Sequence, residues 1–402
     1  MGGPAEREPW YYRSVYRNWA NFRRFIRRSL FAPREAPYRL TLKRAVALLS
    51  FCGLYTVTEI AASLGFLLDD VFAPAYRQTR VDAPVFIIGN PRSGTTLLHR
   101  LLAQDTETFT TMRLLDILFA PSVTQQRFAR GLARLDAALG GPIRRTIGHL
   151  DAAAARGNVL HSARLLAPEE DQFLMVHPWA GLAVWHFSGV LEEASPYTRF
   201  DTAVPPGDKT SIMGFYASAV RRHLHAHQLG GGHTHHYLAK NPAASPMVAS
   251  LCEVFPDARF IYLVRNPLQM IPSMISTLDL TWQLLGSPPR RYAGRDYVLE
   301  MAKHWYTYPL ERLAELPSDR RFIVTFDELT RHADTTVTRI YERFGLRLSA
   351  AFERTLAHEA AAARTYRSSH RYDLDAMGLT RDQIERDFAA VFERFGFSTG
   401  ED

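Results

Sequence analysis

The chain has 402 residues, of which 47% are hydrophobic and 22% are charged, and this composition excludes a globally disordered protein. Its two cysteines exclude a disulfide framework, and its formal charge of +7 fits an anionic substrate or an anionic membrane surface. No signal peptide and no Asn-x-Ser/Thr acceptor are apparent, so we expect a cytoplasmic protein that can contact the inner face of the membrane.

The first 80 residues predict a basic, aromatic helical arm (residues 1–80) that precedes a catalytic domain (residues 81–402). Aromatic and apolar residues recur every three or four positions from Tyr12 to Leu30, as on one face of a helix. The same stretch carries six arginines and no acidic residue. Two alternatives remain open: the arm packs on the catalytic domain, or it lies in a membrane interface with its arginines on lipid phosphates.

A second apolar stretch covers residues 45–68. Glu59 interrupts it, so that it holds no uncharged run of eighteen residues, and a membrane-spanning helix is not favoured. Any membrane contact is therefore expected to be peripheral. Nucleic-acid binding is not predicted, because nothing else in the chain resembles a nucleic-acid module.

From residue 81 onward, short apolar runs alternate with segments of helical periodicity. A helical middle section extends to about residue 230. The predicted strands are residues 85–88, a strand beginning at Tyr237, Arg259–Val264 and Phe322–Phe326. This alternation predicts an α/β fold of the P-loop type, in which helices flank a mostly parallel sheet.

The first predicted strand ends on a phosphate-binding loop. Gly89 and Gly94 have the spacing at which backbone N–H groups cradle an anion at a helix N-terminus. Thr95 stands where a nucleoside triphosphate requires a lysine, and the cation lies inside the loop as Arg92. The loop therefore suits a ligand that places one phosphate in the loop and a further group beyond it. A P-loop kinase or NTPase is the alternative function among enzymes.

The segment Pro91-Arg92-Ser93-Gly94-Thr95-Thr96 resembles the 5′-phosphosulfate loop of the sulfotransferase superfamily, whose donor is 3′-phosphoadenosine 5′-phosphosulfate (PAPS). This form of the loop is typical of bacterial sulfotransferases and of the tyrosylprotein sulfotransferases. The resemblance implies that Arg92, Ser93, Gly94, Thr95 and Thr96 hold the 5′-phosphosulfate. It also implies transfer of a sulfuryl group to an acceptor hydroxyl without a metal, which leaves adenosine 3′,5′-bisphosphate.

Two further elements resemble the same superfamily. Arg265 follows the strand 259–264, and Ser273 lies eight residues later in the next helix, as in the family's 3′-phosphate site. A guanidinium group and a hydroxyl suit a dianionic phosphate. Lys240 matches the lysine that approaches the transferring sulfuryl group, where a cation stabilises the charge on the bridging oxygen.

The identity of the general base remains open between three acidic residues and one histidine. Cytosolic sulfotransferases use a histidine two residues after the matching lysine, but Pro242 stands there in this chain. The alternatives are Asp116, the pair Glu169 and Glu170, and His161, each of which needs to reach the acceptor hydroxyl.

The sequence says less about the acceptor. An apolar, aromatic segment at 177–187 lines an acceptor pocket or forms a core helix, and we expect a small-molecule or lipid hydroxyl. Six histidines between 223 and 236 are interpreted as a surface loop rather than a metal site, so no metal is predicted. The oligomeric state is not predicted. A non-catalytic nucleotide-binding membrane adaptor is the alternative from another functional class.

Overall fold

A five-stranded parallel sheet forms the centre of the molecule, in a computed structural model that describes residues 17–31, 40–157, 165–231, 235–285, 291–365 and 372–397. The strand order is β2-β3-β1-β4-β5, and every neighbouring pair is parallel. The strands are β1 (Val85–Gly89), β2 (Phe109–Thr110), β3 (His236–Lys240), β4 (Arg259–Val264) and β5 (Arg321–Thr325).

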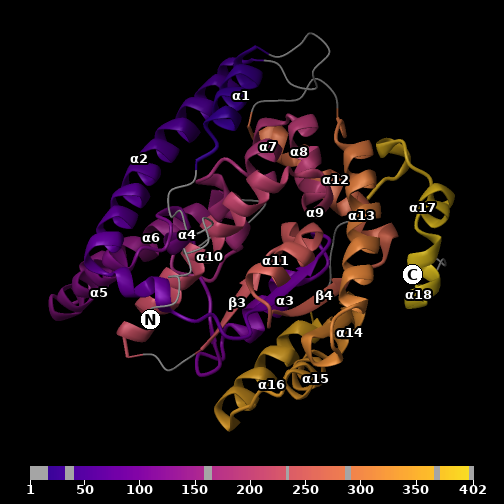
Figure 1. Cartoon of the computed structure of the whole chain (residues 1–402). Coiled ribbons are helices and arrows are strands. Elements are labelled where there is room, and N and C mark those ends of the chain that lie inside the picture. Colours follow the sequence, from indigo (N-terminus) through magenta and orange to yellow (C-terminus); the bar gives the residue numbers. More distant parts are fainter. Residues whose placement is uncertain are drawn as a thin grey trace, which may run out of the picture.

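Helices surround this sheet (Figure 1). Before β3 lie α1 (Trp19–Leu30), α2 (Leu42–Phe72), η2 (Pro74–Gln78), α3 (Thr95–Leu102), α4 (Leu114–Leu118), α5 (Val123–Ala138), α6 (Pro142–Gly157), η3 (Asp171–Val176), α7 (Leu182–Ser188), α8 (Leu191–Thr198), α9 (Phe200–Ala203) and α10 (Pro206–Leu229). After β3 lie η4 (Pro242–Met247), α11 (Val248–Val254), α12 (Pro267–Leu284), α13 (Arg295–Ala314), η5 (Ser318–Arg320), α14 (Phe326–Arg331), α15 (Ala333–Phe344), α16 (Ala350–Thr365), η6 (Asp375–Met377), α17 (Arg381–Asp387) and α18 (Ala389–Phe395).

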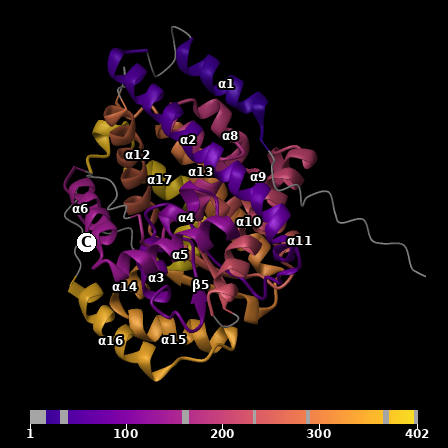
Figure 2. The same cartoon turned by 90° about the vertical axis from the view of Figure 1, so that its left-hand side faces the viewer.

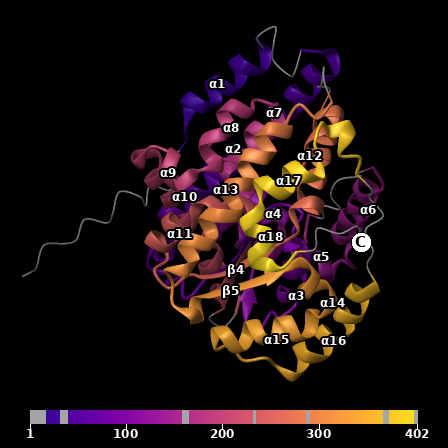
Figure 3. The same ribbon diagram turned by 90° about the vertical axis from the view of Figure 1, so that its right-hand side faces the viewer.

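The central strand β1 is buried on both faces, because successive side chains of a strand point to opposite sides. Val85 and Ile87 belong to one apolar core with residues of α3, α15 and α16. Phe86 and Ile88 belong to the other core, with residues of α10, α11 and α13. Figure 3 shows α15 and α16 below β4 and β5, on the side away from α1 and α2. The predicted α/β architecture is thus confirmed.

Helices α1 and α2 lie along one side of the molecule (Figures 1 and 2). The ring of Phe25 in α1 lies 5.0 Å from that of Trp179, and Phe25 is buried. Arg24 pairs with Glu193 at 2.8 Å. Phe22, Phe25 and Ile26 of α1 therefore pack on the protein, whereas Trp19 and Leu30 remain exposed.

Two sequence expectations need correction. The short strand β2 was not predicted, because two residues carry no periodicity. The histidine-rich segment is not a single surface loop: His223, His225 and His227 belong to α10, and His236 belongs to β3. His223 is buried and its Nε2 lies 2.9 Å from Thr110 Oγ1, so it helps to fix β2; His233 lies outside the described residues.

Candidate active site

Three neighbouring strands bring the predicted site residues to one edge of the sheet. Ile87 of β1 is paired with Lys240 of β3, and Gly89 of β1 is paired with Leu263 of β4. The loop after β1, Asn241 after β3 and Arg265 after β4 therefore leave the sheet side by side. Ligands of open α/β sheets bind at this carboxyl edge.

The loop after β1 has the backbone geometry of an anion cradle. Gly89 has φ +147°, and a Cβ there would lie 2.4 Å from the carbonyl oxygen of Leu263. Gly94 has φ +90°, and a Cβ there would lie 2.7 Å from the ring of Phe326. Arg92 itself has φ +69°, an unfavourable conformation for a non-glycine residue that is typical of functional loops.

Polar atoms around this loop are left for a ligand. Ser93 and Asn90 are fully buried, yet the hydroxyl of Ser93 and both side-chain polar atoms of Asn90 have no hydrogen-bond partner within the described part of the chain. The same holds for Oδ1 of Asn241. A buried polar atom without a partner costs free energy, so these groups fit a polar donor molecule bound against the loop.

Arg92, Ser273 and Arg265 form one connected cluster rather than two separate pockets. Arg92 Nε donates to Ser273 Oγ at 3.1 Å, and Arg265 Nη1 donates to the backbone carbonyl of Arg92 at 2.8 Å. The guanidinium group of Arg265 also lies 4.2 Å from the ring centroid of Phe326. Burial, followed by the charge of Arg92, lowers the pKa of Arg265.

Tyr372 completes this cluster, although no sequence motif marks it. Its hydroxyl donates to Ser273 Oγ at 3.0 Å. The residue comes from the segment before η6, far from the phosphate loop in sequence.

Lys240 lies beside the phosphate loop and two carboxylates. Its side chain is 1% exposed, and Nζ donates to Thr96 Oγ1 at 3.1 Å. Nζ also forms an ion pair with Glu170 and lies 3.9 Å from Oε1 of Glu169. Thr95 and Thr96 begin α3, so the lysine points at a helix N-terminus that also attracts anions.

Glu169 and Glu170 are placed there by contacts of the preceding segment. Pro168 forms an isolated bridge with Arg113, and the Glu169 amide donates to the carbonyl of Met112 at 3.1 Å. Glu170 additionally accepts a hydrogen bond from Gln172. The pair therefore lies against Lys240.

Asp116 has a different environment. It caps α4, where Oδ2 accepts from the amide of Arg113 at 3.0 Å and from its Nε at 2.9 Å, while Oδ1 accepts from Nη2 at 3.0 Å. Burial alone would raise the pKa of Asp116, but the hydrogen bonds and charge of Arg113 lower it overall. His161, the remaining candidate base, lies outside the described residues.

A buried carboxyl group follows the glutamate pair. Asp171 Oδ2 accepts hydrogen bonds from the hydroxyls of Tyr216 and Tyr237, the latter at 2.8 Å. Burial raises the pKa of Asp171 to about 6. Because Tyr237 lies in β3, this group ties the Glu169–Glu170 segment to the strand that carries Lys240.

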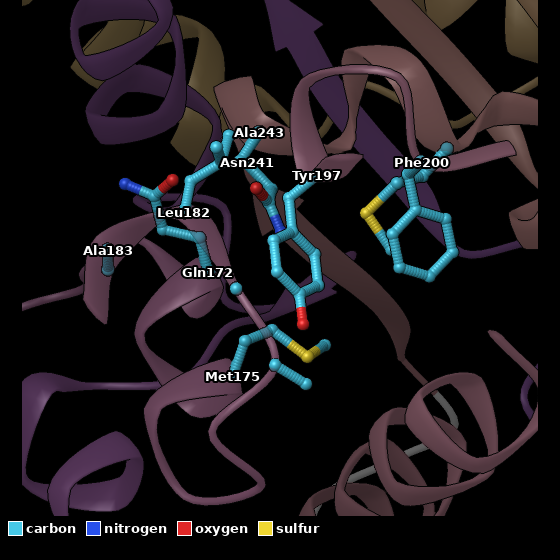
Figure 4. Close-up of a pocket in the computed structure, with 11 residues that line it drawn as sticks. Gln172, Met175, Leu182, Ala183, Tyr197, Phe200, Asn241 and Ala243 are labelled. Carbon is cyan, nitrogen blue, oxygen red and sulfur yellow. The ribbon is translucent and has the colours of Figure 1, made fainter. Parts of the chain in front are cut away.

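An apolar pocket lies next to this edge (Figure 4). Asn241, the neighbour of Lys240, lines it, and the empty space measures about 350 Å³, part of it open to solvent. Its other lining residues are Gln172, Met175, Ala180, Gly181, Leu182, Ala183, Tyr197, Phe200, Ala243 and Met247. Residues 180–183 belong to the apolar segment 177–187, which the sequence predicts to line an acceptor pocket or to form a core helix. In the structure these residues line the pocket and lead into the helix α7.

Comparison with known proteins decides the family. The model of the sulfotransferase family matches residues 84–350, which is more than half of the chain. The chain belongs to the sulfotransferase family. It is a PAPS-dependent sulfotransferase, and this membership decides against the kinase and adaptor alternatives.

Relatives of the sulfotransferase support the same conclusion. The omega-hydroxy-beta-dihydromenaquinone-9 sulfotransferase Stf3 of Mycobacterium tuberculosis (strain CDC 1551 / Oshkosh) is 26% identical over 364 residues, which cover 86% of this chain and 84% of the relative. The protein of the same name from Mycobacterium bovis matches equally. Among solved structures, sulfotransferase STF9 from Mycobacterium avium has a TM-score of 0.70 at 20% identity and covers 98% of this chain and 93% of its own. STF1 from M. tuberculosis H37Rv has a TM-score of 0.64 at 21% identity, with 92% of each chain covered, and both structures share the fold.

Proposed function

We propose that the three strand ends hold PAPS between the loop after β1 and the Arg265–Ser273 cluster. The observation that carries this proposal is the joined arrangement of Arg92, Ser273 and Arg265 beside buried, unpartnered polar atoms of the loop. The loop amides, Ser93, Thr95 and Thr96 would receive the 5′-phosphosulfate. Arg265 and Ser273 would receive the 3′-phosphate, because a guanidinium group binds a dianionic phosphate through charge-assisted hydrogen bonds.

Lys240 is proposed to stabilise the leaving group. During transfer, the bond between sulfur and the bridging oxygen breaks and its electron pair stays on that oxygen, while a new bond forms between sulfur and the acceptor oxygen. Lys240 lies beside Thr96 of the loop, so its ammonium group is close to the charge that develops on the bridging oxygen.

The acceptor proton is proposed to go to the Glu169–Glu170 pair. Both carboxylates lie beside the ammonium group of Lys240, where a general base would have to reach the acceptor hydroxyl. Glu169 is the better candidate, because Glu170 is engaged by both Lys240 and Gln172. Asp116 is not the base that we propose, since both of its oxygens accept from Arg113.

For the acceptor we propose a hydroxyl on a lipid or another hydrophobic molecule. The pocket beside Asn241 is lined mainly by apolar side chains, which suit an apolar acceptor. The name of the relative Stf3 also describes a hydroxylated menaquinone derivative as its substrate. Such acceptors reside in membranes, so we further propose peripheral membrane contact.

The test is a transfer assay with radiolabelled PAPS and bacterial lipid extracts dispersed in detergent. We expect label in a lipid fraction, and transfer should be lost in Lys240→Met. Label transferred only to water-soluble alcohols would contradict the proposed acceptor class, and no transfer to any hydroxyl would contradict the proposed site.

A further inference from the structure

The outward side of α2 is apolar along almost its whole length. In this fully described helix, every exposed position from Val46 to Phe72 is uncharged. Its exposed large hydrophobic residues are Leu42, Val46, Leu49, Leu54, Val57, Ile60, Leu64, Leu67, Val71 and Phe72. Monomeric proteins rarely expose so long a continuous apolar patch, which indicates an interaction surface.

The opposite side of α2 is polar and fixed to the protein. Arg44 Nη2 donates to the carbonyl of Ser188 at 2.6 Å, and Glu59 lies 2.9 Å from His177 Nδ1. Asp69 is fully buried and pairs with Arg222 at 3.1 Å. By length and composition, helix α2 is long and apolar enough to span a membrane. Spanning would expose these charges to lipid, so the helix lies on the protein with one side outward.

The hairpin of α5 and α6 extends this surface. Gln125 of α5 donates to the carbonyl of Ala61 in α2, and Figure 2 shows α2, α5 and α6 on the same side of the molecule. Large apolar side chains are exposed on the hairpin as well, at Phe128, Leu132, Leu135, Leu139 and Ile143.

The hairpin (residues 123–157) carries an excess of positive charge, with six arginines and two aspartates. Residues 123–149 contain five arginines, at 127, 130, 134, 144 and 145. Their only acidic residue is Asp136, which is buried and accepts from the amide of Ile143 at 2.7 Å. Exposed arginines beside exposed apolar side chains are typical of surfaces that bind anionic lipid.

We propose that the outward side of α2 together with the α5–α6 hairpin, here termed the docking face, binds the surface of an anionic lipid bilayer. The apolar side chains would enter the boundary between headgroups and acyl chains, while the arginines contact lipid phosphates. The inference places the main membrane contact on α2 and the hairpin rather than on α1, whose Phe22, Phe25 and Ile26 pack on the protein.

A second copy of the chain fits this face less well. An isologous contact would bring together two copies of the same arginine-bearing face, where like charges repel. The lipid surface also fits the position of the pocket: Trp179, the neighbour of the pocket residue Ala180, lies 4.7 Å from the ring of Tyr55 in α2. The inference thus rests in part on the proposed lipid acceptor, which would reach the pocket from the adjoining bilayer.

The experiment measures co-sedimentation of the full chain with vesicles of phosphatidylcholine alone or mixed with phosphatidylglycerol. Wild-type protein should bind the anionic vesicles, more weakly at high salt. The double variant Ile60→Glu/Leu64→Glu should lose about tenfold or more in affinity, because each change removes an apolar anchor and adds a repelled charge. Arg127→Gln/Arg134→Gln should reduce the preference for anionic vesicles.

The matched control is Ala357→Glu, which adds an exposed negative charge on α16, away from the docking face. It should bind like the wild type. A second readout does not depend on a loss of binding. When Leu67→Cys is labelled with an environment-sensitive fluorophore, its emission should shift to shorter wavelength on addition of anionic vesicles, relative to wild-type protein treated with the same reagent.

Failure of wild-type protein to bind anionic vesicles, or unchanged binding by Ile60→Glu/Leu64→Glu, would overturn the proposal. A dimer in analytical ultracentrifugation that this variant dissociates, without vesicle binding by the wild type, would instead identify the face as a contact between copies. Vesicle binding requires neither donor nor acceptor, so the detergent transfer assay tests the proposed function independently.

Discussion

Lys240 and Glu170 form an ion pair in which the lysine side chain is 1% exposed and the glutamate side chain 11%. The two residues are 70 positions apart in sequence and meet because the hydrogen bond of Tyr237 to Asp171 holds the segment of Glu170 against β3, which ends at Lys240. A buried pair of this kind costs desolvation energy, and removal of one partner leaves an uncompensated charge. Its position beside Thr96 gives it a functional rather than a stabilising role in our account.

Replacement of the lysine should therefore impair the chemical step. We predict that Lys240→Met lowers kcat by about 10²- to 10³-fold, because the charge on the leaving oxygen loses its cation. Binding of adenosine 3′,5′-bisphosphate should change much less. Steady-state kinetics with radiolabelled PAPS measures the effect, and the control is Lys303→Met in α13, a half-exposed lysine that pairs with Glu300 and Asp387. A variant with wild-type turnover would remove Lys240 from the mechanism.

Substitutions of Glu169 and Glu170 should have different effects on the kinetics. We expect Glu169→Gln to lower kcat by about 10²-fold or more, as loss of a general base does. Glu170→Gln removes the ion-pair partner of Lys240 and should lower kcat less than Glu169→Gln. If only Asp116→Asn reduces kcat, the proposed base is wrong.

Donor binding should depend on the cluster of Arg92, Ser273 and Arg265, which joins the loop after β1 to the residues after β4. Arg265→Ala should weaken binding of adenosine 3′,5′-bisphosphate by about 10- to 100-fold, since a charge-assisted phosphate contact is lost. Tyr372→Phe should have a smaller effect in the same direction, because its hydroxyl only orients Ser273. Arg331→Ala, an exposed arginine of α14, should bind normally. Equal affinities for Arg265→Ala and the wild type would contradict the assignment.

The close approach of β4 to the loop should make Gly89 irreplaceable. A methyl group at Gly89 would meet the carbonyl oxygen of Leu263 at 2.4 Å, and the φ of +147° is unfavourable for alanine. We predict that Gly89→Ala lowers the free energy of unfolding by more than about 1 kcal/mol and weakens nucleotide binding. Denaturant unfolding measures the first effect; Gly131→Ala, where a methyl group meets open space, should not be destabilised by any clash.

Buried histidines should make the protein less stable in mild acid. Burial lowers the pKa of His223 to about 4 and, with the charges of Lys240 and Arg100, that of His99 to about 3. The unfolded chain takes up these protons below about pH 6.5 while the native state does not, so stability is lost as the pH falls from there towards 4. Asp171, whose pKa is raised to about 6, acts in the opposite direction.

The comparison of variants isolates this contribution. Between pH 7 and pH 5, unfolding free energy should fall less steeply for His223→Gln than for the wild type, by up to about 1.4 kcal/mol per pH unit. Parallel curves for the two proteins would show that His223 is not held neutral in the native state.

The sequence predicted the parts of the site that depend on local spacing. The glycines of the loop, Arg92, and the strand-end position of Arg265 follow from motifs within a few residues, and the structure places them at one edge because parallel strands end together. The parallel α/β sheet followed from alternating strands and helices, which is also a local signal.

What the sequence did not predict depends on distant contacts. Tyr372 reaches Ser273 from the C-terminal segment, and no local pattern marks such a tertiary contact. The choice among acidic candidates likewise needed the structure. Only packing shows that Arg113 donates hydrogen bonds to Asp116, while Glu170 forms an ion pair with Lys240. The inward face of α1 and the outward face of α2 could not be distinguished by apolar periodicity alone, since both helices carry an apolar side.

The most direct test of the central claim, that three strand ends form one donor site, is calorimetric titration of the purified protein with adenosine 3′,5′-bisphosphate. We predict saturable binding at a single site, which is weakened in Arg265→Ala and preserved in Arg331→Ala. The absence of saturable heat at millimolar nucleotide, or identical binding by both variants, would contradict the account.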